Sequence, residues 1–142
     1  MGNCKIKVTL ESVTYGGKDI GNDWKYRVTL TCTRVFRTVQ KDFPEHIFNH
    51  GQTENLDEVL KEHVHGDCRG PIPGFEFIIG IIATEADSWW DDSKGRSRIL
   101  GFECGVDTRQ TVRVSVKERA WWRFWGRPAK LDFVFRFELE CV

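Results

Sequence analysis

Apolar and polar residues alternate along much of the chain with a period of two. The clearest run lies between residues 130 and 141, where apolar positions face away from a row of mostly charged ones. A β-strand with one packed face and one wet face produces this pattern, because successive side chains point to opposite sides. Three further runs, over residues 4–11, 24–32 and 112–117, predict strands of the same kind.

The segment 75–82 is apolar on both faces, which predicts a central strand of a sheet. Residues 98–104 form a weaker candidate strand, and turns rich in Gly, Pro, Asp and Asn separate the runs. We therefore expect one domain, residues 1–142, with an all-β fold: an antiparallel Greek-key β-sandwich of about eight strands, with a closed barrel as the competing architecture. The predicted core residues are Ile6, Val8, Val28, Leu30, Phe77, Ile79, Ile81, Val114, Phe133, Phe135 and Phe137.

One interval follows a different period. Between residues 53 and 64, four side chains recur at helical spacing: Leu56, Val59, Leu60 and His63. Thr53 is suited to cap the start of a helix, and Gly66 is suited to stop it. The pattern predicts one short helix in a connection, near Leu56 to Val64.

Composition narrows the class of protein. Of 142 residues, 40% are apolar and 30% charged, which is typical of a globular domain. Lys+Arg and Asp+Glu balance at 21 each, so no broad basic field is available for nucleic acid. No run approaches the roughly 20 apolar residues of a spanning helix, and no secretory signal is evident. We expect a soluble, cytoplasmic protein, with peripheral attachment to a membrane as an alternative, and leave its oligomeric state open.

The five cysteines are scattered and include no CxxC pair. Three of them fall on apolar faces of predicted strands, where a free cysteine behaves as a small hydrophobic residue. This distribution favours a reducing compartment over a disulfide framework. One bridge between the terminal strands remains open as an alternative.

Two loops are rich in acidic residues. One precedes the strand that begins near Trp24, and the other, residues 84–95, follows the apolar strand. Calcium takes six to eight oxygen ligands in flexible geometry, and carboxylates on loops at one end of a sandwich can supply them. Glu85 and Asp87 suit this role, because alternate residues at a strand end point the same way. The competing interpretation is that these are ordinary solvated turns.

The order of these features resembles a C2 domain, a β-sandwich family that binds phospholipid membranes with calcium. Asp19, Gly21, Asp23 and Trp24 occupy the places of the family's Asp, Gly, Asp and aromatic residue before the second strand. Residues 85–87 and 92–95 resemble the family's third loop, and the segment 122–125 resembles its tail. The resemblance implies a calcium site at one end of the sandwich, formed by Asp19, Asp23, Glu85, Asp87 and Asp92.

Histidines and tryptophans supply two further candidate groups. All four histidines lie between positions 46 and 65, and a zinc site is the less favoured metal alternative, with candidate ligands His46, His50, His63, His65 and Cys68. Trp89 and Trp90 lie in the second acidic loop, where they are suited to contact a membrane or a partner.

No motif of a known catalytic class is present, so we do not expect an enzyme. The sequence predicts a non-enzymatic, C2-like binding module that attaches to a phospholipid membrane or a partner with calcium, through loops at one end. The alternative is a metal-independent protein-interaction or assembly module that uses a sheet edge and exposed tryptophans.

Overall fold

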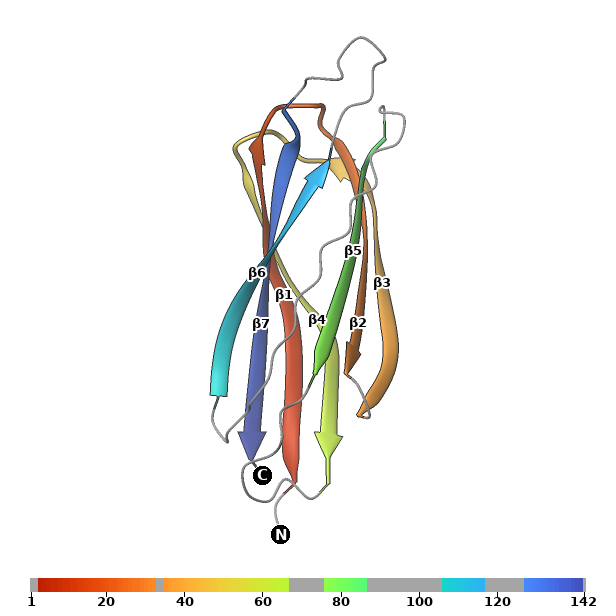
Figure 1. The fold of residues 1–142 in the computed structure, drawn as a ribbon, viewed down its shortest axis with the longest axis vertical. Helices are drawn as coiled ribbons and strands as arrows, with labels where there is room; N and C mark the ends of the chain where they lie inside the picture. The colour runs from red at the N-terminus through yellow and green to blue at the C-terminus, as the bar shows by residue number, and fades with distance from the viewer. Residues whose placement is uncertain (1–2, 33–34, 67–75, 87–105, 117–126, 142) are drawn as a thin grey trace.

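Two antiparallel β-sheets make up the described part of the protein. The computed structural model describes residues 3–32, 35–66, 76–86, 106–116 and 127–141, and these contain seven strands and no helix. One sheet has the order β4-β1-β7-β6 and the other β3-β2-β5 (Figure 1). The strands are β1 (Cys4–Gly17), β2 (Asp23–Cys32), β3 (Phe36–Ile47), β4 (Thr53–His65), β5 (Phe77–Glu85), β6 (Val106–Val116) and β7 (Ala129–Cys141).

The core lies between the two sheets and is built from the alternating apolar positions. All eleven predicted core residues are buried, which confirms that interpretation of the period-two pattern. Aromatic contacts join the sheets: the ring centroids of Phe77 and Phe137 are 5.0 Å apart, and those of Tyr26 and Phe133 are 5.2 Å apart. The predicted all-β, antiparallel architecture is therefore confirmed.

The predicted helix near Leu56 to Val64 is wrong. This interval belongs to β4, which pairs antiparallel with β1 along almost its whole length. Leu56 and Leu60 are four residues apart, a spacing that places two side chains on one face of a helix and also on one face of a strand. The strand forms here and not the helix, because pairing with β1 satisfies the backbone N–H and C=O groups along that edge of β1.

The number and order of strands also differ from expectation. The described residues contain seven strands, not eight, and the candidate strand 98–104 lies outside them. The apolar segment near residues 75–82 begins as a strand at Phe77 and ends at Glu85. Within the described residues β5 borders its sheet, although its apolar faces predicted a central place.

One side of the sandwich is closed by side chains of β3 and β4, which belong to different sheets. Lys41 Nζ lies 3.1 Å from Glu58 Oε1, and His46 Nε2 lies 2.9 Å from Glu54 Oε2. At the other end of these strands, Lys61 Nζ lies 5.6 Å from the ring centroid of Phe36. These contacts hold the two edge strands together without a shared backbone ladder.

Cys4 differs from the expectation of free thiols and agrees with the alternative of a bridge at the terminal strands, whereas Cys32 is free as expected. Cys4 is buried and disulfide-bonded, and its Cα partner in the β1–β7 ladder is Cys141. Cys32 is a buried free thiol, and burial raises its pKa to about 12. Cys68 and Cys104 lie outside the described residues.

Candidate functional site

The first acidic loop lies at the end of the sandwich where β1, β3, β5 and β6 finish, called the loop end below (Figure 1). The buried phenol of Tyr15 organises it: the hydroxyl accepts a hydrogen bond from Ile20 N at 2.8 Å and lies 2.9 Å from Gly21 O, to which it donates. Burial raises the pKa of Tyr15 to about 12. Trp24 Nε1 donates to Gly21 O at 3.2 Å, so β1 and β2 both fix the loop.

Glu85 ends β5 against this same loop. Its side chain is fully buried, and its Oε1 accepts a hydrogen bond from Asp23 N at 3.3 Å. Gly21 has a φ of +134°, and a Cβ built there would lie 2.6 Å from the Glu85 carboxylate. Only glycine combines this backbone conformation with so close an approach. The end of β5 is therefore locked to the β1–β2 loop.

Three of the five predicted calcium ligands can be placed. Asp19, Asp23 and Glu85 all lie at the loop end, where Asp19 Oδ1 accepts from Gly21 N at 3.2 Å and Glu85 accepts from Asp23 N. Asp19 thus accepts from a backbone donor of its own loop, as turn residues do, whereas Glu85 accepts from Asp23 N across the junction between β5 and β2. Within the described ranges, no three His, Cys, Asp or Glu side chains are grouped to hold a metal ion. Asp87, Asp92, Trp89 and Trp90 lie outside those ranges.

The candidate zinc ligands lie far apart. His46 contacts Pro44 O and Glu54 near the loop end, and His50 Nε2 donates to Gly17 O at 2.7 Å in the same region. His63 is nine residues further along β4 than Glu54, roughly 30 Å at the rise of a strand. One ion therefore does not contact both groups. The side chain of His65 is not described, and Cys68 lies outside the described residues.

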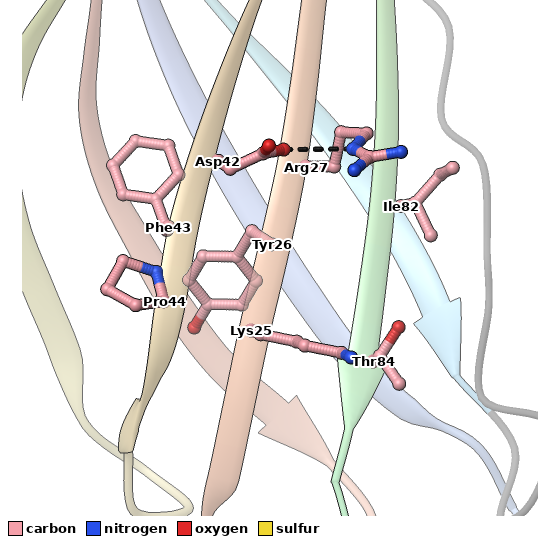
Figure 2. Close-up of a pocket in the computed structure, with 8 residues that line it drawn as sticks. All are labelled: Lys25, Tyr26, Arg27, Asp42, Phe43, Pro44, Ile82 and Thr84. Atoms are coloured by element: carbon pink, nitrogen blue, oxygen red, sulfur yellow. Dashed lines mark hydrogen bonds and ion pairs between the residues drawn. The ribbon is translucent and has the colours of Figure 1, made fainter.

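A shallow hollow of about 390 Å³ lies on the outer face of the three-stranded sheet (Figure 2). Its rim carries the exposed pair of Arg27 and Asp42, whose Nε and Oδ1 atoms are 2.9 Å apart. Lys25 lies beside its ladder partner Thr84, and Ile82 projects from β5 (Figure 2). The register between β2 and β3 shifts between Trp24 and Tyr26, and the extra residues opposite Lys25 include Pro44. This bulge contributes to the hollow.

β5 forms the other border of this outer face. Its outward positions are Ile78, Gly80, Ile82 and Thr84, all half-buried, and its ladder with β2 has no register shift. Sequence reasoning placed β5 correctly as an apolar strand but missed β3, because alternation fails along it: most of its side chains are exposed. Pro44, which is confined in sheets to edges and bulges, was the available signal.

Comparisons with known proteins assign this chain to no family. No protein-family model matches the chain, and no curated protein matches it significantly. In the ranges that the structure covers, there is no helix with the length and apolar character needed to cross a membrane. These observations define the described part of the chain as an all-β, two-sheet fold with a structured loop end and a border strand, β5, that is uncharged from Phe77 to Thr84.

Proposed function

We propose that this protein is a non-enzymatic interaction module that binds an extended segment of a partner protein along β5. One observation carries the proposal: β5 has no charge, proline or bulge between Phe77 and Thr84, although it borders its sheet among the strands that the structure describes. Natural edge strands are usually protected by charged side chains, proline or bulges, which prevent pairing with another chain. An unprotected edge is the surface that strand addition uses.

The chemistry around β5 defines the partner. The half-buried side chains of Ile78 and Ile82, separated by Gly80, favour apolar residues at alternate positions of the incoming strand. Lys25 lies one strand inward and forms no ion pair with any described residue, whereas its neighbour Arg27 is paired with Asp42. The partner segment therefore carries alternating apolar residues and one acidic residue near the end that lies beside Lys25.

A phage-displayed library of random peptides tests this specificity. Selection on the wild-type protein is expected to enrich extended sequences with alternating apolar residues and a terminal acid. Ile82→Lys places a charge on β5 and is expected to weaken the binding of the selected peptides at least tenfold, which corresponds to about 1.4 kcal/mol of binding free energy. Lys25→Gln is expected to weaken the acidic peptides by a few-fold.

Val59→Lys is the matched control, because Val59 is an exposed apolar residue, 44% accessible, on the edge strand β4 of the other sheet. It should leave peptide binding unchanged. Enrichment of peptides that bind Ile82→Lys as tightly as wild type would reject β5 as the binding strand.

A second candidate function is calcium-dependent binding to a membrane or partner at the loop end. The observation in its favour is that Glu85, which is far in sequence from Asp19 and Asp23, lies fully buried against the loop that carries them. Asp87 and Asp92 would complete the ligand set.

Thermal melts with calcium and with chelator test this second function. A calcium site predicts stabilisation of roughly 2.7 kcal/mol at a hundredfold excess over the dissociation constant, lost on Asp87→Asn. The interaction module predicts identical melts and calcium-independent peptide binding. A calcium-dependent rise in Tm would support calcium-dependent binding at the loop end in place of strand pairing along β5.

A further inference from the structure

A second hollow, of about 530 Å³, lies at the loop end beside the junction of β1 and β7. The residues lining it are Gly17, Lys18, Arg127, Pro128 and Lys130. Three of these five are cations, and no carboxylate is found among the described residues that line the hollow. None of the three forms an ion pair with another described side chain. This arrangement contrasts with the nearby outer face of the same sheet, where Arg113 pairs with Asp132 at 2.7 Å.

The backbone beneath the three cations is fixed. Lys18 N donates to Pro128 O at 3.0 Å, and Gly17 pairs with Ala129 at the end of the β1–β7 ladder. Gly17 has a φ of +68°, and a Cβ there would lie 2.6 Å from Pro128 O. The hydrogen bond from His50 to Gly17 O ties the β3–β4 connection to the same point. The cations are therefore attached to a rigid base.

We propose that this hollow binds a phosphate-bearing anion. Three unneutralised cations around one concave surface repel one another, and a bound anion removes that repulsion. Lysine and arginine together are the usual ligands of phosphate groups, lysine as a point charge and arginine through a planar fork. Asp19, the acid adjacent to Lys18 in sequence, is directed to Gly21 N instead. The site is independent of β5 and of calcium.

Titration with inorganic phosphate and with glycerol 3-phosphate, followed by amide chemical shifts, tests the site. Saturable shifts are expected at Gly17, Lys18 and Lys130, and the affinity should fall as salt rises. Lys18→Gln and Lys130→Gln are each expected to weaken binding about fivefold, as for removal of one cation near an anionic surface. Arg37→Gln is the matched control, because it removes one exposed cation from β3 in the opposite sheet.

Sedimentation with vesicles distinguishes the source of the phosphate. If the phosphate belongs to a lipid headgroup, phosphatidylcholine vesicles that contain phosphatidic acid should bind the wild-type protein. The same vesicles should then fail to bind either lysine variant. Saturation by glycerol 3-phosphate without vesicle binding assigns a free phosphorylated ligand. Absence of saturable shifts would overturn the proposal. Equal weakening by Arg37→Gln and the hollow variants would also overturn it, because binding would then follow overall charge.

Discussion

β3 and β5 flank the same strand, β2, but they present opposite kinds of edge. β3 carries charged residues along its length, contains Pro44, and pairs with β2 through two register shifts. β5 is uncharged until Glu85 and pairs with β2 without a shift. β3 is also tied by side chains to β4 across the corner of the sandwich. Among the described strands, this contrast supports the proposal that β5, and not β3, is the border available for pairing.

The largest expected effect concerns the anchor that fixes β5. Gly21→Ala places a methyl group against the Glu85 carboxylate in a backbone conformation open only to glycine. We expect a loss on the order of 3 kcal/mol in the free energy of unfolding, measured by chemical denaturation. Gly51→Ala is the control: Gly51 has a φ of +86° but no neighbouring atom within 4 Å, so about 1 kcal/mol is expected. Equal losses would mean that the contact with Glu85 does not fix β5.

The contact between Gly21 and Glu85 is one of the features that the sequence alone could not predict. Alternation identified the cores of β1, β2, β6 and β7, because the buried face of a strand must be apolar at every second position, and β5 was identified because it is apolar on both faces. It could not identify β3 and β4, whose exposed edges carry mixed residues. The proximity of Glu85 to the first loop was suggested by the placement of both acidic loops at strand ends and by the resemblance to a C2 domain. Its approach to Gly21 depends on a strand register that composition does not encode.

A smaller effect is expected at the irregular edge strand β4. Asp57 has a left-handed backbone with a φ of 46° and lies where the register with β1 shifts. Asp57→Gly should raise the free energy of unfolding by about 0.5 kcal/mol, because relief of the strain slightly exceeds the added chain entropy. Asp57→Ala serves as the control and should lower it. A loss with both variants would show that the Asp57 side chain itself stabilises the bulge.

The smallest effect is the pH dependence of the ion pair on the protected side. The hydrogen bond from Arg27 holds the pKa of Asp42 below its usual value. The pair therefore stabilises the fold above the pKa of Asp42 in the unfolded chain, and this contribution disappears as pH falls through the lowered folded pKa. In Asp42→Asn, the free energy of unfolding should therefore fall slightly less steeply as pH decreases in the acid range. An NMR titration that gives Asp42 an ordinary pKa would contradict the pairing.

Amide hydrogen exchange along β5, resolved by NMR, tests the central claim most directly. An open edge predicts alternation between Ile78 and Ala83: amides bonded to β2 exchange slowly, and those facing away exchange almost as fast as exposed loops. Addition of a selected peptide should then protect the fast set. Uniform slow exchange across Ile78 to Ala83 in the protein alone would contradict the account, because β5 would already have a strand on both sides.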